Sequence, residues 1–294
     1  MKNTLILLTL ATASAWSATP VPNQEIAKPM PTVTVTDTAY HGSFINTERP
    51  IGETGRPEWT SARRFSTTRV YIQREPWEVG VGQWWRYRYK RDNSSISRLT
   101  SEIEMGLPYR MQLDVYYDMA VDGDSRSRTE DFAVELRYAL ADWGVIPLNP
   151  TLYAEYKWVD QAPDVLELKL LLGDQIAGGW HYGINLIYER QLGGELETEC
   201  QVVGGISKSL LDGRLGIGVE AKYNHATVHE ERSNPEHIFL VGPSVQWRIT
   251  ERLHLDATAL FGANQDSPRN ECYLILGYDF GKEDGKYHPV SGQR

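Results

Sequence analysis

Residues 109–121 read YRMQLDVYYDMAV, and this stretch decides the fold. Tyr109, Met111, Leu113 and every second residue up to Val121 are apolar or aromatic, while the residues between them are mostly polar or charged. Alternation with a period of two is typical of a β-strand that has one apolar and one polar face. Thirteen residues exceed the usual strand length of about 5–6 and suit a strand that crosses a bilayer at a tilt.

Eleven further stretches of the chain alternate in the same way, and together they predict twelve strands. No 3.6-residue pattern persists over a comparable window, so we expect essentially no helix in this region. The predicted strands are 77–90, 96–107, 109–121, 128–140, 151–159, 164–172, 179–191, 195–210, 214–225, 237–249, 253–263 and 270–280.

Two features distinguish a membrane barrel from a soluble β-sandwich, which shows the same alternation. The first is that aromatic residues gather at the ends of the apolar faces, as they do at membrane interfaces. The second is that short turns such as 211–213 and 250–252 alternate with longer charged loops such as 226–236. We therefore predict an all-β fold, a closed antiparallel up-and-down transmembrane β-barrel of about 12 strands. The stretch 141–150 (ADWGVIPLNP) departs from this pattern, because it is long and apolar on the side where short turns are expected.

The composition excludes several other classes of protein. The chain has 294 residues with 30 Lys and Arg against 39 Asp and Glu, a formal charge of −9. An acidic chain repels phosphate, so we expect no nucleic-acid partner. Two cysteines in this length do not make a disulfide scaffold, and Cys200 and Cys272 fall on predicted strands that are not neighbours, so both are expected to be free.

The ends of the chain differ in character from the predicted barrel. Residues 1–15 have a positive start, an apolar run and a small-residue cleavage pattern, and we expect a signal peptide. Residues 16–65 are rich in proline and are expected to form a largely irregular periplasmic segment, with a folded plug as the alternative. The barrel is predicted over 66–280, and a polar C-terminal tail over 281–294. These features predict a location in the cell outer membrane of a Gram-negative bacterium.

Three stretches resemble a known family of bacterial outer-membrane β-barrels. They are 99–116 (LTSEIEMGLPYRMQLDVY), 132–140 (FAVELRYAL) and 165–172 (VLELKLLL), and they resemble the transporter group related to the MetA pathway of phenol degradation. The resemblance covers about residues 77–280 and implies an exported twelve-stranded barrel with a role in transport. The last predicted strand ends in Tyr278-Asp279-Phe280, an aromatic ending of the kind that barrel-assembly machinery recognises.

The polar faces of the predicted strands carry charges of both signs, which we expect to point into the lumen. The simplest interpretation is structural, because buried charges must be paired or hydrated. The alternative is a conduit in which Arg86, Arg88 and Lys90 face Glu102 and Glu104 and create a transverse field that orients solutes. The predicted lumen-facing residues are Arg86, Arg88, Lys90, Glu102, Glu104, Arg110, Asp114, Asp118, Glu135, Arg137, Glu155, Lys157, Glu167, Lys169, Glu189, Glu220, Lys222, Arg248, Asp256 and Asp279.

No motif indicates an enzyme, and no catalytic, cofactor-binding or metal-binding residue is predicted. The chain lacks a Gly-x-Ser-x-Gly elbow, and the pair of His254 and Asp256 on one strand face is best explained as a hydrogen-bonded polar pair. We expect a passive channel or transporter-like pore for small solutes. A structural or surface-interaction barrel with a sealed, salt-bridged lumen is the alternative, and a membrane-embedded hydrolase is a remote one. The expected partners are outer-membrane lipid, the barrel-assembly machinery and small solutes.

Overall fold

A computed structural model describes residues 48–123, 128–176 and 178–280, and within them the twelve predicted strands are confirmed. The described residues contain no α-helix, and their short 3-10 turns include η2 (Glu58–Ser61) and η3 (His229–Glu231). No helix in these ranges is long and apolar enough to cross a membrane. The strands are β3 (Val79–Tyr89), β4 (Ser95–Leu107), β5 (Met111–Asp122), β6 (Arg128–Ala139), β7 (Thr151–Trp158), β8 (Val165–Ile176), β9 (Trp180–Gln191), β10 (Thr198–Leu210), β11 (Leu215–Thr227), β12 (Glu236–Arg248), β13 (Leu253–Gly262) and β14 (Asn270–Phe280).

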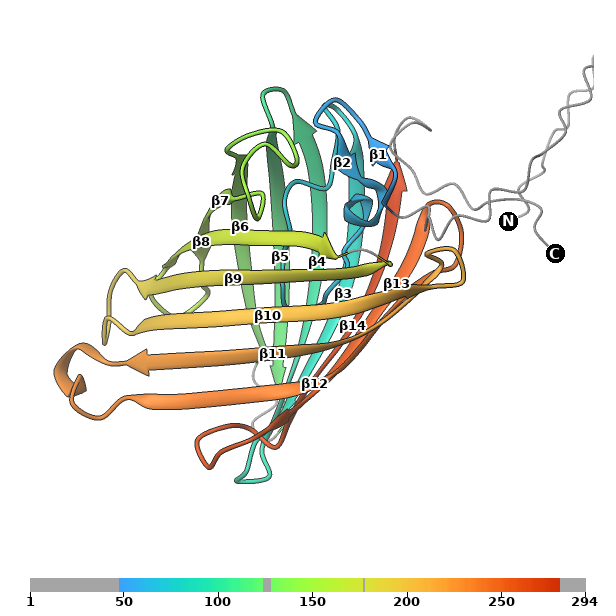
Figure 1. Cartoon of the computed structure of the whole chain (residues 1–294). Coiled ribbons are helices and arrows are strands. Elements are labelled where there is room, and N and C mark those ends of the chain that lie inside the picture. The colour runs from blue at the N-terminus through green and yellow to red at the C-terminus, as the bar shows by residue number, and fades with distance from the viewer. Residues whose placement is uncertain (1–47, 124–127, 177, 281–294) are drawn as a thin grey trace, which may run out of the picture. The chain divides into compact units, whose positions relative to one another are not determined.

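The twelve strands form one closed barrel (Figure 1). Each strand pairs antiparallel with the next in the sequence, and β14 closes the barrel against β3, from the pair Val79↔Phe280 to the pair Tyr89↔Asn270. Closure pairs the backbone of every barrel strand on both sides, which is what a sheet needs in a medium that offers no water. The predicted up-and-down barrel is confirmed.

The outer surface of the barrel is apolar. On β5 the side chains of Gln112, Asp114 and Tyr116 are buried, while the apolar residues between them are more exposed. Ile103, Leu136 and Val202 are typical of the outward positions and are 54%, 43% and 46% exposed. Large apolar side chains exposed around the whole barrel belong against hydrocarbon, so the chain is a transmembrane barrel. Within the described residues Cys200 and Cys272 are both free, as expected.

The two ends of the barrel differ. We call the end that carries the connections 108–110, 140–150, 211–214 and 249–252 the turn rim. The opposite end carries 159–164, 192–197, 228–235 and 263–269, and we call it the loop rim. Apart from 140–150, the connections of the turn rim are shorter than those of the loop rim, which is characteristic of outer-membrane barrels.

The chain before β3 does not stay outside the barrel. β1 (Pro50–Ile51) and β2 (Arg56–Pro57) form a two-stranded ribbon. Residues 56–78, which we call the luminal segment, begin with β2, pass through the inside of the barrel and return to the start of β3, where Trp77 is exposed (Figure 1). Trp59, Phe65 and Tyr71 of this segment are at most 1% exposed. Residues 56–65, expected as the end of an irregular periplasmic segment, therefore belong with the interior of the barrel; the earlier part of that predicted segment, the signal peptide and the C-terminal tail lie outside the described residues.

Candidate functional site

Arginines of the luminal segment pair with carboxylates of the barrel wall. Arg74 Nη2 lies 2.5 Å from Glu104 Oε2 on β4, and its Nη1 lies 2.6 Å from Asp279 Oδ1 on β14. Arg69 Nη2 lies 2.7 Å from Glu102 Oε1. These groups are almost fully buried, and a buried charge is tolerated only when it is paired and hydrogen-bonded. The luminal segment thus supplies the positive charge that the acidic wall needs.

The innermost part of the luminal segment is anchored by one carboxylate. Glu220 on β11 accepts hydrogen bonds from the backbone N–H groups of Ser66 (2.9 Å) and Thr67 (2.7 Å) and from the Thr67 hydroxyl (2.6 Å). Thr258 on β13 donates a fourth hydrogen bond to Glu220 (2.8 Å), and its Oγ1 also lies 2.7 Å from Ser66 Oγ. Hydrogen bonds to a charged acceptor are stronger than neutral ones, so Glu220 is the main tether of this turn.

A row of glycines makes room for the segment. Gly173, Gly183 and Gly205 lie opposite one another on β8, β9 and β10. A Cβ atom at Gly173 or Gly183 would lie 2.5 Å from a methyl group of Val70, and one at Gly205 would lie 2.5 Å from the Phe65 ring. Real Cβ atoms do not approach other atoms so closely, so these three positions accept the luminal segment only because they have no side chain.

A small apolar core closes the turn rim around the luminal segment. The Trp143 ring lies edge-on to the rings of Trp59 (5.8 Å between centroids) and Tyr71 (5.3 Å). Tyr71, which lies outside the strands, donates a hydrogen bond to the Ala141 carbonyl (2.7 Å), and burial raises the pKa of Tyr71 to about 12, so the phenol keeps its proton. This contact explains the long apolar connection 141–150, whose tryptophan covers the segment.

A continuous acidic row crosses the inner wall. Seven carboxylates on seven consecutive strands lie directly opposite one another. They are Glu104, Asp114, Glu135, Glu155, Glu167, Glu189 and Glu199. Like charges in such positions repel, and cations on the same wall or on the luminal segment offset this repulsion. Arg137 is the central cation of this row. It lies 2.7 Å from Asp114 and also pairs with Glu135, and all three side chains are fully buried.

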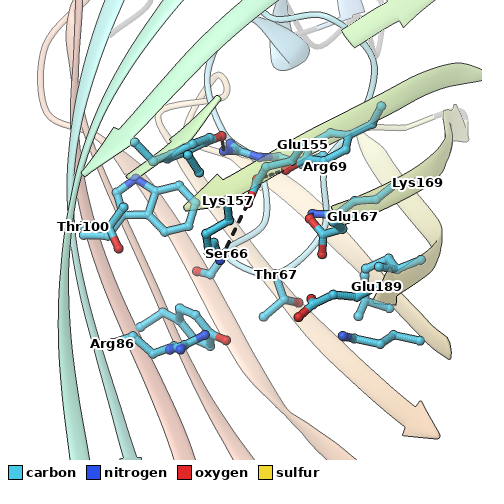
Figure 2. A pocket seen from close by; sticks show the side chains of 18 of the residues that line it. Ser66, Thr67, Arg69, Arg86, Thr100, Glu155, Lys157, Glu167, Lys169 and Glu189 are labelled. Carbon is cyan, nitrogen blue, oxygen red and sulfur yellow. Dashed lines mark hydrogen bonds and ion pairs between the residues drawn. The ribbon is translucent and has the colours of Figure 1, made fainter. Parts of the chain in front are cut away.

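The loop-rim half of the lumen holds a cavity of about 220 Å³ (Figure 2). Ser66, Thr67 and Arg69 of the luminal segment form one end of it. The luminal segment itself is tightly packed, because the void that its own side chains enclose measures only about 10 Å³, close to the smallest that holds a water. The cavity wall combines charges of both signs with aromatic rings. Its charged residues from the strands are Arg86, Arg98, Asp118, Glu155, Lys157, Glu167, Lys169, Glu189 and Lys222, and its rings are Trp84, Tyr116, Tyr153 and Tyr273.

The predicted lumen-facing residues fall into three groups, and all of them are buried or half-buried. The first group surrounds the luminal segment or the turn-rim half and comprises Glu102, Glu104, Asp114, Glu135, Arg137, Glu220, Arg248, Asp256 and Asp279. The second group lines the cavity and comprises Arg86, Asp118, Glu155, Lys157, Glu167, Lys169, Glu189 and Lys222. The third group lies near the rims: Arg88 pairs with Glu271 (2.5 Å), Lys90 follows β3, and Arg110 pairs with Asp142 (3.4 Å) in a turn. The expected contact of His254 with Asp256 is present at 2.7 Å.

The transverse field predicted from Arg86, Arg88 and Lys90 against Glu102 and Glu104 is wrong. Glu102 and Glu104 lie opposite Gly82 and Gly80, near the end of β3 that is remote from Arg86, Arg88 and Lys90. Both glutamates form ion pairs with arginines of the luminal segment instead. Several residues that the site needs were not predicted from the sequence, namely Arg63, Arg64, Arg69 and Arg74 of the luminal segment and Arg98, Glu199 and Glu271 of the wall. The three aligned glycines and the run of arginines before the first strand were the available signals.

Among the described residues, one group of carboxylates has the spacing of a metal site. Glu102, Glu104 and Asp114 bring carboxylate oxygens within 4.8 Å of one another. Arg69, Arg74 and Arg137 already contact these three carboxylates, so their charge is offset by side chains of the chain itself. A cluster so neutralised is explained by its ion pairs, and we assign no metal to it.

The fold and its apolar exterior define the class: a twelve-stranded transmembrane β-barrel of the outer-membrane type. No family model and no curated protein matches the chain. Solved structures similar in fold include the NanC porin (TM-score 0.49, 10% identity, 69% of this chain and 100% of that chain) and the KdgM porin (0.47, 9%, 69% and 99%). A COG4313 outer membrane channel from Pseudomonas putida F1 is also similar (0.48, 9%, 71% and 98%). None of these three structures is described as a member of the MetA-pathway group, so the resemblance to that group remains a prediction.

Proposed function

We propose that this protein is an outer-membrane channel for small polar solutes whose passage is closed by its own luminal segment. The observation that supports it is the division of the lumen. A charged cavity of about 220 Å³ occupies the loop-rim half, and the luminal segment fills the turn-rim half. A wall lined with charges of both signs suits hydrated solutes and opposes apolar ones. The barrel sits in outer-membrane lipid and reaches it through the barrel-assembly machinery.

The way the luminal segment is held favours displacement. Residues 62–78 form no strand or helix, so the wall holds them mainly through side chains rather than through a sheet ladder. Near its C-terminal end, backbone hydrogen bonds join Trp77 and Glu78 to Gly106. A segment tethered at this end and fixed elsewhere by polar contacts can leave the lumen when water replaces those contacts, and its departure would join the cavity to the turn rim.

The second candidate is a barrel whose lumen stays sealed. The buried ion pairs between the luminal segment and the wall favour it, because pairs such as Arg74–Glu104 and Arg69–Glu102 are costly to separate. A sealed barrel would serve a structural or surface role and would pass no solute. The two candidates differ in one measurable property, the conductance of the intact protein.

Replacing the tether of the segment tests the channel directly. We expect Glu220→Gln to raise the frequency of open events of the full chain in a planar bilayer by roughly tenfold or more. The neutral amide weakens the charge-assisted bonds to Ser66 and Thr67, and a loss of about 1.4 kcal/mol is a factor of ten in an equilibrium.

The matched control is Glu251→Gln, the same chemical change at an exposed turn-rim position, which should leave the events unchanged. Silence of the wild-type protein and of Glu220→Gln, with both barrels folded, would contradict the channel and support the sealed barrel.

A further inference from the structure

Two cations of the cavity wall lack the partners that the others have. Arg63 and Arg69 pair with Glu102, Arg98 with Asp118, Lys157 with Glu155, and Lys169 with Glu167. Those pairs span 2.6 to 3.6 Å. Among the described residues, Arg86 on β3 and Lys222 on β11 form no ion pair, although both line the cavity.

Glu271, a carboxylate that acts on both cations, cannot serve them both. Glu271 on β14 is fully buried, one of its oxygens lies 2.5 Å from Arg88 Nε, and the other accepts the Tyr273 hydroxyl hydrogen bond. Lys222 lies within the electrostatic reach of Arg86 and Arg88 and of two carboxylates, Glu271 and Glu199. Glu199 already accepts hydrogen bonds from the Gln201 and Asn224 side chains. Three cations therefore share two carboxylates, and such a group of charges gains from a further anion.

The opposite wall limits the charge that the cavity accepts. Figure 2 places Arg86 on one side of the cavity and Glu167 and Glu189 on the other. Within the described residues Glu189 forms no ion pair, while Glu155 and Glu167 are balanced by their lysines. Among the residues that line the cavity, two unpaired cations and one unpaired carboxylate leave an excess of one positive charge, which a single negative charge neutralises.

We propose that the cavity is a binding site for a small monoanionic organic acid, with its carboxylate held between Arg86 and Lys222. The guanidinium offers a planar pair of donors to a carboxylate and the ammonium adds a compact charge. Glu155 and Glu189 would then accept hydrogen bonds from hydroxyl groups of the solute. This inference rests on the proposed channel for its biological meaning, although the site itself can be tested without any transport.

The test is equilibrium dialysis of the detergent-solubilised full chain against three solutes that differ at one carbon: gluconate (an anion), sorbitol (neutral) and glucamine (a cation). We expect gluconate to bind roughly tenfold or more tightly than the other two. The double variant Arg86→Met/Lys222→Met should lose that preference. The control Glu167→Gln/Lys169→Met removes a paired charge of each sign from the same cavity and should keep it.

Equal binding of gluconate and sorbitol to the wild-type protein would overturn the inference, and so would a preference that survives in Arg86→Met/Lys222→Met. Sorbitol flux through liposomes carrying Glu220→Gln, whose luminal segment is less firmly tethered, separates this failure from failure of the channel. Sorbitol flux without a preference for gluconate in binding would contradict the anion site and leave the proposed channel standing. Gluconate binding without flux in any variant leaves the site standing and contradicts the channel.

Discussion

Removing residues 56–74 is expected to turn a closed barrel into an open pore, with a conductance roughly tenfold or more above that of the wild-type protein. The twelve strands and the pairing of β3 with β14 do not involve these residues, so the barrel should still close. The deleted stretch carries five arginines and one glutamate, so the exposed wall becomes more acidic. The new pore should therefore prefer cations, as a reversal potential in a salt gradient would report.

A deletion at the other end of the barrel provides the control for this result. Removing residues 230–234 from the loop between β11 and β12 shortens the chain at the loop rim and leaves the luminal segment in place. It should not raise the conductance. A folded deletion of 56–74, identified by the shift between unboiled and boiled samples on a gel, that still conducts no more than the wild-type protein would show that the luminal segment does not close the passage.

Arg137→Met is expected to have the largest effect on stability among single substitutions of the wall. Arg137 contacts Asp114 (2.7 Å), Glu135 and the Gln73 side chain of the luminal segment (3.1 Å), and no part of Arg137, Asp114 or Glu135 is exposed. Removing one partner leaves two uncompensated carboxylates and costs about 3–5 kcal/mol. Denaturant unfolding of the protein in detergent micelles, followed by tryptophan fluorescence, should show the lower midpoint.

Two further variants make this prediction specific. Arg128→Met removes an exposed arginine that pairs with exposed Glu130, and it should change the midpoint little. Adding Asp114→Asn and Glu135→Gln to Arg137→Met removes the two carboxylate charges that have lost their partner. The triple variant should therefore recover much of the lost stability. A midpoint for Arg137→Met equal to that of the wild-type protein would contradict the buried cluster, as would a triple variant no more stable than the single one.

The barrel itself could be predicted from the sequence because its signal is local. In residues 109–121 the polar or apolar character of each side chain indicates the face of the strand on which it lies. Alternation alone therefore predicts β5 and the polar residues that point into the barrel. Strand ends were less certain: β8 runs to Ile176, four residues beyond the predicted 164–172. The extra residues include Gly173, whose place in the glycine row depends on the luminal segment.

The site could not be predicted to the same extent, because its contacts are between residues far apart in the sequence. Ser66 meets Thr258 across 192 positions, and Arg64 meets Gln246 across 182. No periodicity marks such a segment, and its prolines suggested a linker instead. The prediction of a transverse field failed for the same reason. Glu102 and Glu104 lie on the polar face as expected, but their partners come from a segment that was predicted to lie outside the barrel.

Because the luminal segment lies inside the barrel, a disulfide should be able to join its innermost turn to the wall. In a background of Cys200→Ser/Cys272→Ser, the pair Ser66→Cys/Thr258→Cys should oxidise almost completely in the folded protein, because the two side-chain oxygens lie 2.7 Å apart. The control pair Ser66→Cys/Ser101→Cys, whose second residue is exposed on β4, should not. Mass spectrometry of the digested protein should find the 66–258 link, and its absence from a folded barrel would contradict the account.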